Sequence, residues 1–284
     1  MEKSDELKIA IEIVKEAGAI LLQYYDKELI VSLKDNNTPV SDADIAADDL
    51  IIKRLKENFT YPILSEESVD DKNRLGKEFV WIVDPLDGTK DFIQKTGEFT
   101  VVIGLVQNDQ PIMGVVYRPT TKELYYAEKN KGAFIEVDGN EKRIVVSKSE
   151  SISSARFTVS KSDFSNSDFM DKIGATNRTR VGSAALKICK VAQGEYDAFF
   201  VLKSKMSEWD DCAPGIILSE AGGILSNVFG GLLLYNQENV LRTKGTMANN
   251  GILHKELIKK IYPFALEGCS DSDPSASDSH RRKC

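Results

Sequence analysis

The chain has 284 residues, of which 42% are hydrophobic, and a formal net charge of −7 at pH 7. This size is enough to bury a full core in one large or two moderate domains. The acidic balance disfavours nucleic-acid polymers as partners, because binding them requires a basic face. No apolar run is long enough to cross a membrane, and the first residues do not resemble a signal peptide, so we expect a cytoplasmic protein with no membrane partner.

Helices open the first half and strands follow. Apolar residues at helical spacing predict a first helix from Leu7 to about Tyr25, and Ser41 is a suitable N-cap for a second helix that ends near Asn58. Short apolar runs bounded by turn residues then predict strands. These runs are Val80–Asp84, Thr100–Gln107, Ile112–Arg118 and Glu123–Glu128.

After about residue 149 the pattern alternates between strand and helix. The predicted elements are Arg156–Ser160, Ser165–Ile173, Thr179–Gly182, Ser183–Gln193, Tyr196–Leu202, Glu208–Glu220 and Gly223–Ser226. The order indicates an α+β domain over residues 1–149 and an α/β domain over 150–266, packed as stacked layers. The Ser- and Asp-rich segment 267–284 is expected to be a disordered tail.

The strand that begins near Phe79 ends in two carboxylates, Asp84 and Asp87, followed by a glycine and a threonine. Ligand crevices lie at the carboxyl ends of such interior strands, so both acids stand where a metal ion could be held. Taken alone, an Asp-Pro or Asp-Gly pair is more typical of a plain turn. The functional interpretation therefore depends on other acidic residues elsewhere in the chain.

These acids are present: the pair Glu66-Glu67 lies upstream, and Asp210, after Trp209, lies downstream. Several carboxylates without Cys or His partners favour Mg²⁺, a hard cation that prefers oxygen ligands. Only two histidines are present in the whole chain, which argues against a histidine-based zinc or iron site. Two magnesium ions about 4 Å apart can bind a phosphoryl oxygen and activate a water molecule. The set of acids therefore indicates a phosphomonoesterase.

These motifs together resemble those of the inositol monophosphatase superfamily, the lithium-sensitive, magnesium-dependent phosphatases. Within it, the segment from Asp87 to Ile93, followed by Gly97-Glu98-Phe99-Thr100, is similar to the 3'(2'),5'-bisphosphate nucleotidase branch. The resemblance covers about residues 5–265. It implies an α+β fold, a layered α/β/α/β/α sandwich of the inositol monophosphatase and fructose-1,6-bisphosphatase type, with two or three Mg²⁺ ions as cofactor.

The resemblance also assigns roles to individual residues. The metal ligands that it implies are Glu66, Asp84, the carbonyl of Leu86, Asp87 and Asp210. Thr89, with Glu66, matches the threonine that orients the attacking water. Thr89 can also cap the helix that starts at this residue, and the two roles are compatible. Gly88 would let the backbone approach a phosphate closely.

Asp44 has two interpretations that can both hold. It stands three residues after Ser41, where an acidic side chain closes a capping box. The segment from Thr38 to Asp44 also resembles a superfamily element whose aspartate lies near the metals and the water. For Asp210, the alternative to a metal ligand is an N-cap residue, with Trp209 as an aromatic core residue beside it.

A nucleotide bisphosphate would present one of its two phosphates to the metal ions. A second phosphate needs cationic or amide donors. The candidates are Lys161, Lys187 and the backbone at Gly182, Ser183 and Ala184, with Asp87, Gly88, Thr89 and Asp210 also expected to contact substrate. The alternative for Lys187 is a solvated helix lysine.

The resemblance implies hydrolysis of the 3'-phosphate of 3'-phosphoadenosine 5'-phosphate, and of its 5'-phosphosulfate analogue as a further substrate. The expected partner is thus a small bisphosphorylated nucleotide. An inositol phosphate phosphatase is the second hypothesis, and a catalytically silent nucleotide or metal sensor is the third. A monomer and a homodimer both remain open.

Overall fold

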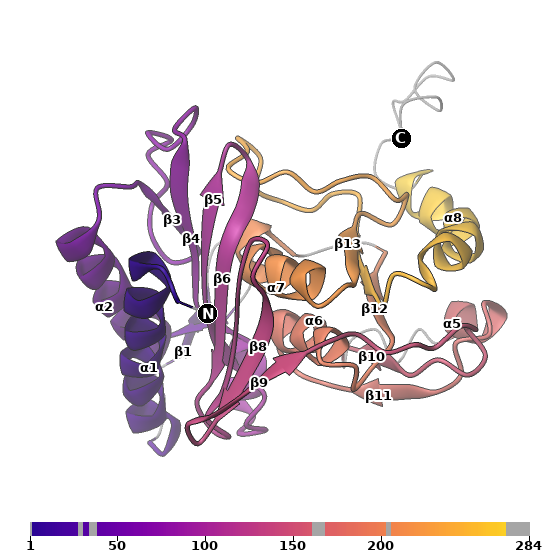
Figure 1. The fold of residues 1–284 in the computed structure, drawn as a ribbon, viewed down its shortest axis with the longest axis horizontal. Helices are drawn as coiled ribbons and strands as arrows, with labels where there is room; N and C mark the ends of the chain where they lie inside the picture. Colours follow the sequence, from indigo (N-terminus) through magenta and orange to yellow (C-terminus); the bar gives the residue numbers. More distant parts are fainter. Residues whose placement is uncertain (1, 28–30, 34–38, 161–167, 203–205, 271–284) are drawn as a thin grey trace.

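The computed structural model describes residues 2–27, 31–33, 39–160, 168–202 and 206–270. Within these ranges the elements stack in five layers: helices, sheet, helices, sheet, helices (Figure 1). The helices are α1 (Asp5–Tyr25), α2 (Asp42–Asn58), α3 (Thr89–Ile93), α5 (Asp168–Lys172), α6 (Ala184–Ala192), α7 (Glu208–Glu220) and α8 (His254–Ser270). The layer order is the one expected for the α+β sandwich. No helix in the described ranges is long and apolar enough to span a membrane.

The larger sheet has seven strands. In spatial order they are β3 (Ile63–Ser65), β4 (Phe79–Asp87), β5 (Thr100–Gln107), β6 (Gln110–Arg118), β7 (Glu123–Glu128), β8 (Gly132–Val137) and β9 (Asn140–Ile144). Strands β3 and β4 are parallel, and every other neighbouring pair is antiparallel. Because β4 lies inside the sheet, its apolar residues are buried on both faces, as its near-continuous hydrophobic sequence predicts.

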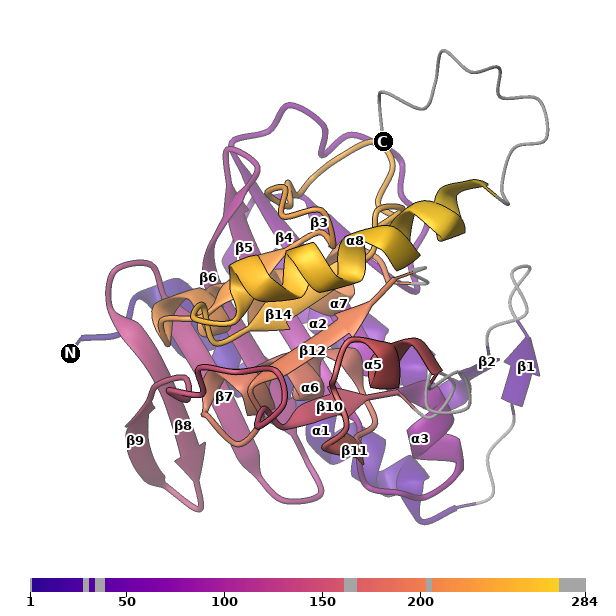
Figure 2. The ribbon, with the colours of Figure 1, turned by 90° about the vertical axis from the view of Figure 1, so that its right-hand side faces the viewer.

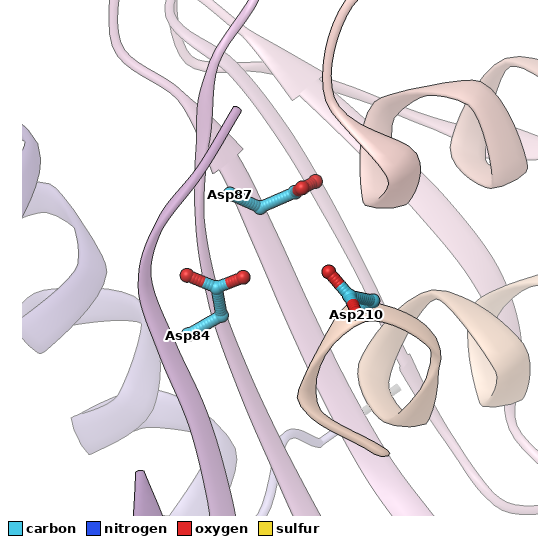
Figure 3. Close-up of side chains that lie close together, drawn as sticks. All are labelled: Asp84, Asp87 and Asp210. Atoms are coloured by element: carbon cyan, nitrogen blue, oxygen red, sulfur yellow. The ribbon is translucent and has the colours of Figure 1, made fainter. Parts of the chain in front are cut away.

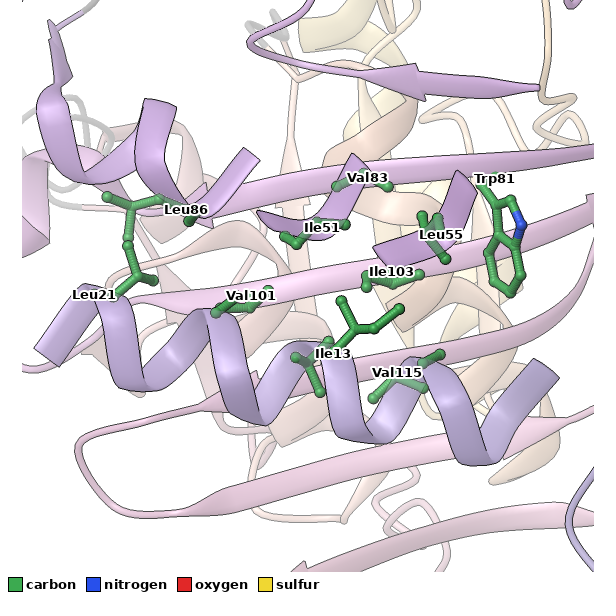
Figure 4. Packing of buried hydrophobic residues seen from close by; sticks show 14 of the residues in the cluster. Ile13, Leu21, Ile51, Leu55, Trp81, Val83, Leu86, Val101, Ile103 and Val115 are labelled. Atoms are coloured by element: carbon green, nitrogen blue, oxygen red, sulfur yellow. The ribbon is translucent and has the colours of Figure 1, made fainter. Parts of the chain in front are cut away.

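Helices α1 and α2 cover one face of this sheet. The side chain of Ser4 accepts a hydrogen bond from the amide of Leu7 and caps α1. Apolar residues at helical spacing, among them Ile13 and Leu21, then face Val101 and Val115 of the sheet (Figure 4). This packing fixes α2 beside the carboxyl end of β4, where the two predicted aspartates lie.

Helices α6 and α7 lie between the two sheets. The smaller sheet has five strands, in the order β11 (Arg178–Arg180), β10 (Phe157–Val159), β12 (Ala198–Val201), β14 (Thr246–Asn249) and β13 (Ile224–Ser226). Helices α5 and α8 cover its outer face (Figure 2). A separate two-stranded ladder joins β1 (Val31–Leu33) to β2 (Pro39–Ser41), directly before α2. The first turn of α7, which belongs to the second half of the chain, thus lies beside the end of β4.

The predicted elements agree with the structure where the local signal is strong. Strands β5 and β7 and helix α7 have the predicted bounds, whereas β4 continues beyond Asp84 to Asp87. The elements that were not predicted are β1, β2, β3, β8, β9, β14 and α8. Helix α8 runs past the expected tail boundary at 266 to Ser270, and residues 271–284 lie outside the described ranges. Of the helix expected over Ser165–Ile173, the described part is α5.

Candidate metal and phosphate site

Three carboxylates from two elements meet at the end of β4. Asp84 and Asp87 come from this strand, and Asp210 is in the first turn of α7 (Figure 3). One oxygen of each side chain lies within 4.8 Å of the others, so a single cation can contact all three. Asp84 is 1% exposed and Asp87 6% exposed, while Asp210 is partly exposed.

A break in the β4 ladder explains how two acids of one strand reach the same place. Opposite strand β5, Asp84 pairs with Val102 and Asp87 pairs with Thr100, so β4 contains one extra residue over this stretch. Such a bulge changes the side of the strand on which the following side chain emerges. Pro85, which has no amide hydrogen for the ladder, lies inside the break.

The cluster contains more negative charge than its surroundings neutralise. Burial, together with the charges of Glu66, Asp87 and Asp210, raises the pKa of Asp84 well above its ordinary range. Burial and the charges of Asp87 and Glu66 do the same to the pKa of Asp210. In addition, the buried Oδ2 of Asp84 has no hydrogen-bond partner among the described residues. A bound cation would satisfy this oxygen and remove the repulsion, so the donor set fits a metal ion.

A cavity of about 250 Å³ opens over the carboxylates. The lining residues are Glu66, Asp84, Leu86, Asp87, Gly88, Thr89, Lys90, Asp91, Ser183, Ala184 and Asp210. The side chain of Leu86 is buried in the core beside Leu21, which leaves its backbone to face the cavity (Figure 4). All five residues predicted as metal ligands are therefore at one site.

Thr89 and Asp44 form a hydrogen-bonded pair at the cavity wall. The hydroxyl of Thr89 lies 3.1 Å from Oδ1 of Asp44 and 3.3 Å from the carbonyl oxygen of Leu86. Oδ2 of Asp44 accepts hydrogen bonds from the amide and the hydroxyl of Ser41, at 2.8 and 2.6 Å. Asp44 thus closes the capping box of α2, as its first interpretation predicts. It also contacts Thr89, and its role near the metals and the water stays a prediction. Gly88, with φ of 99°, makes the turn before α3.

Asp210 likewise has two contacts of different kinds. It is the third residue of α7, and its Oδ2 accepts a hydrogen bond from the amide of Ser207, 2.5 Å away, in a capping box. The N-cap is therefore Ser207 rather than Asp210. The neighbouring Trp209 packs against a separate apolar cluster, which orients the helix start so that Asp210 faces β4.

Asp87 connects the cluster to the start of α6. Its carboxylate accepts hydrogen bonds from the hydroxyl of Ser183 and from the amides of Ala184 and Ala185, at 3.1 and 2.7 Å. The amide of Gly182 donates to Glu98 at 2.9 Å. The backbone amides of Gly182 and Ala184, which the sequence predicts as phosphate donors, thus donate hydrogen bonds to protein carboxylates. Ser183 and Ala184 nevertheless line the cavity.

Of the two predicted lysines, only Lys187 is among the described residues, and it does not line the cavity. Lys187 is 4% exposed, its Nζ donates to the carbonyl oxygen of Val181 at 3.2 Å, and it lies 5.3 Å from the ring centroid of Phe199. The solvated-lysine interpretation is therefore wrong, and a substrate role for Lys187 stays a prediction. Lys161 lies outside the described residues. Lys90 is the one cationic side chain among the described lining residues. The sequence reasoning missed it, although it belongs to the Asp87–Ile93 motif.

A model of the inositol monophosphatase family matches residues 2–263. The chain belongs to this family. It is 33% identical to the 3'(2'),5'-bisphosphate nucleotidase CysQ of Aggregatibacter actinomycetemcomitans over 236 residues, which are 81% of this chain and 87% of the relative. The prediction of a phosphatase of this superfamily, similar to its bisphosphate nucleotidases, is confirmed.

Solved structures agree with this assignment. The inositol monophosphatase of Thermotoga maritima superimposes with a TM-score of 0.79 at 28% identity, covering 93% of this chain and 99% of that chain. CysQ from Bacteroides thetaiotaomicron gives a TM-score of 0.71 at 30% identity, covering 86% and 96%. The expected fold type is therefore confirmed. Because relatives of both names match, the family alone does not choose between nucleotide and inositol substrates.

Proposed function

We propose that this protein is a magnesium-dependent phosphatase that removes the 3'-phosphate of 3'-phosphoadenosine 5'-phosphate, giving AMP and phosphate. The observation that carries the proposal is the cluster of Asp84, Asp87 and Asp210 under a cavity that also exposes Thr89. A set of oxygen donors without Cys or His suits Mg²⁺. When bound, Mg²⁺ would polarise the phosphoryl group and lower the pKa of a water molecule. Two or three ions, and inhibition by lithium, follow from the family resemblance and are part of the proposal.

The residues of the chain hold this chemistry in place. The cation would be held by the three aspartates, by Glu66 and by the carbonyl of Leu86. By donating its proton to Asp44, the Thr89 hydroxyl keeps its lone pairs available to accept a hydrogen bond from a water in the cavity. The hydrogen bonds from Ser41 fix Asp44 in turn, so that it acts through Thr89. Pre-set donors and acceptors of this kind cost no reorganisation during the reaction.

A nucleotide with two phosphates is the substrate class that we favour. The cavity is rich in carboxylates, so the phosphate to be cleaved needs the metal ions, and a second phosphate needs a separate cation. Lys90 is placed to supply it. Relatives named 3'(2'),5'-bisphosphate nucleotidase, at 31–36% identity, support this choice. We place the activity in the cytoplasm, where the buried thiols of Cys189 and Cys212 would stay reduced.

An inositol phosphate phosphatase is the second candidate. It is favoured by a relative named inositol monophosphatase 1 from Homo sapiens, which is 29% identical and is matched over 91% of this chain. A catalytically silent sensor is disfavoured, because none of the acids expected at the metal site, nor Thr89, is replaced in this chain. The 5'-phosphosulfate analogue of the nucleotide is a further substrate that the proposal includes.

The test is phosphate release from 3'-phosphoadenosine 5'-phosphate, AMP and inositol 1-phosphate, measured side by side with Mg²⁺, with and without Li⁺. We expect the bisphosphate to be cleaved with the highest kcat/KM and lithium to inhibit its cleavage. A preference for inositol 1-phosphate would retain the metal site and overturn the substrate. Absence of release from all three, in a folded protein that binds Mg²⁺, would support the sensor.

A further inference from the structure

Asp48 is a buried acid that the catalytic interpretation leaves unexplained. It lies on α2 one turn after Asp44 and is 4% exposed. Its Oδ1 accepts a hydrogen bond from the hydroxyl of Ser65, and its Oδ2 accepts one from the hydroxyl of Ser68 at 2.6 Å. Its hydrogen-bond partners in the described part of the chain are thus two hydroxyl groups.

The two serines stand on either side of Glu66. Ser65 is the last residue of β3 and pairs with Val83 of β4, and the amide of Glu66 donates to the carbonyl oxygen of Val83 at 3.2 Å. After Ser65 the segment has no helix or strand until β4. The backbone that presents Glu66 to the cavity is therefore held by β4 on one side and by Asp48 on the other.

We propose that Asp48 is a positioning residue for the metal site. Through Ser65 and Ser68 it fixes the segment that carries Glu66. Residues four apart lie on the same face of a helix, so α2 uses Asp44 to hold Thr89 and Asp48 to hold Glu66. The two groups that flank the attacking water are then set by a single rigid element.

The chemistry of Asp48 fits this role better than a packing role. Burying a carboxylate costs free energy unless strong partners compensate it, and neutral hydroxyls compensate less than a cation does. A charged acceptor, in return, forms shorter and stronger hydrogen bonds than a neutral one. Outer residues that orient metal ligands commonly change metal affinity by 10- to 100-fold when they are replaced. This inference rests on the proposed magnesium site.

The experiment compares Asp48→Ala with Asp49→Ala. Asp49 is the next residue of the same helix and is exposed, which makes it a matched control. Metal affinity is measured by Mn²⁺ titration, with the free ion followed by its EPR signal, and by the rise in melting temperature that Mg²⁺ produces. We expect Asp48→Ala to weaken metal binding at least about tenfold and Asp49→Ala to leave it unchanged. Asp48→Asn, whose amide can still bond both serines, should recover most of the affinity.

Ser68→Ala gives a second route if Asp48→Ala does not fold. It removes one of the two hydrogen bonds from a partly exposed position and should weaken Mn²⁺ binding in the same direction. Wild-type affinity in folded Asp48→Ala or Ser68→Ala would overturn the positioning role while leaving the phosphatase proposal intact. A wild-type protein that binds no divalent metal and cleaves no phosphate ester would overturn both.

Discussion

Two buried aspartates near the start of α7 should respond in opposite directions to the same substitution. Asp84 is surrounded by other carboxylates, whereas Asp211 is paired with Arg242, whose Nε and Nη2 lie 2.9 and 2.7 Å from its oxygens. In the absence of metal, Asp84→Asn should stabilise the protein, because it removes a charge from a repelling cluster. Asp211→Asn should destabilise it, because it removes the carboxylate that is hydrogen-bonded to a buried guanidinium.

The magnitudes follow from the geometry. Two unit charges within 4.8 Å of each other repel by at least about 3.5 kcal/mol at an effective dielectric constant of about 20. Burial and the neighbouring acids raise the pKa of Asp84, which favours its protonated form and lowers the repulsion. We therefore expect Asp84→Asn to increase the free energy of unfolding by roughly 1–2 kcal/mol.

The Asp211 variant works in the other direction. Burial raises the pKa of Asp211 even beside Arg242, but an arginine does not lose its proton in a protein. Breaking a buried ion pair by removing one partner costs about 3–5 kcal/mol, and the variant should lose an amount in this range. Both side chains of the pair are nearly inaccessible, with 0% and 7% exposed.

The assay is thermal unfolding in the presence of EDTA and again with Mg²⁺. For a chain of this size, 1 kcal/mol corresponds to about 2 °C in Tm. Asp84→Asn should melt a few degrees above wild type in EDTA and gain nothing from Mg²⁺, and it should have lost phosphatase activity. A fall in Tm for Asp84→Asn, comparable to that for Asp211→Asn, would refute the view that the cluster is a cation site under charge repulsion.

Three further predictions concern packing, specificity and acid stability. A Cβ on Gly104 would lie 2.7 Å from Sγ of Cys212, so Gly104→Ala should lower the free energy of unfolding by about 1–3 kcal/mol in thermal unfolding. Adding Cys212→Ala should recover part of this loss. Absence of recovery would contradict a steric cause. Lys90→Gln should lower kcat/KM for 3'-phosphoadenosine 5'-phosphate about tenfold but leave kcat/KM for adenosine 3'-monophosphate unchanged. Equal losses for the two substrates would exclude a contact between Lys90 and the second phosphate. Burial works to raise the pKa of Asp197, but hydrogen bonds from Arg156 and Ser147 outweigh it and lower this pKa below its ordinary 3.8. The stabilisation from the ionised Asp197 is therefore complete above pH 3.8 and is lost as the pH falls through the lowered pKa. In urea unfolding, Asp197→Asn should have a free energy of unfolding about 1–2 kcal/mol lower than wild type at neutral pH, with a smaller difference in acid. A difference that stays constant with pH would contradict this prediction.

The accuracy of the sequence-based predictions follows the strength of the local signals. Helix α7 and strands β5 and β7 have sharp polar boundaries around apolar residues, and their bounds were predicted. Strand β9, with the sequence NEKRI, is an edge strand with four exposed residues, so it lacks the apolar alternation by which strands are recognised. Helix α8 contains Pro263, which normally argues against a helix interior.

The site was predictable to the extent that each residue carries its own motif. Asp87 ends β4, Asp84 follows its apolar run, and Asp210 is in the first turn of α7, where acids are conspicuous. Contacts between distant segments leave no such local mark. Neither the bonds from Asp87 to the start of α6 nor the burial of Lys187 can be inferred from neighbours in the sequence. Asp48, inside a helix that also carries exposed acids, looks like a solvated residue until Ser65 and Ser68 are found against it.

The arrangement of the layers explains why the site needs the whole chain. Strand β4 supplies two acids from the larger sheet, whereas α7 and the start of α6 come from the helical layer between the sheets. Asp87 bonds to the amides that open α6, and Asp210 is fixed by the capping box that opens α7. A cation that binds Asp87 and Asp210 therefore joins elements from both halves of the chain. Because it would bind only the assembled layers, magnesium should stabilise the folded protein as a whole as well as enable its chemistry.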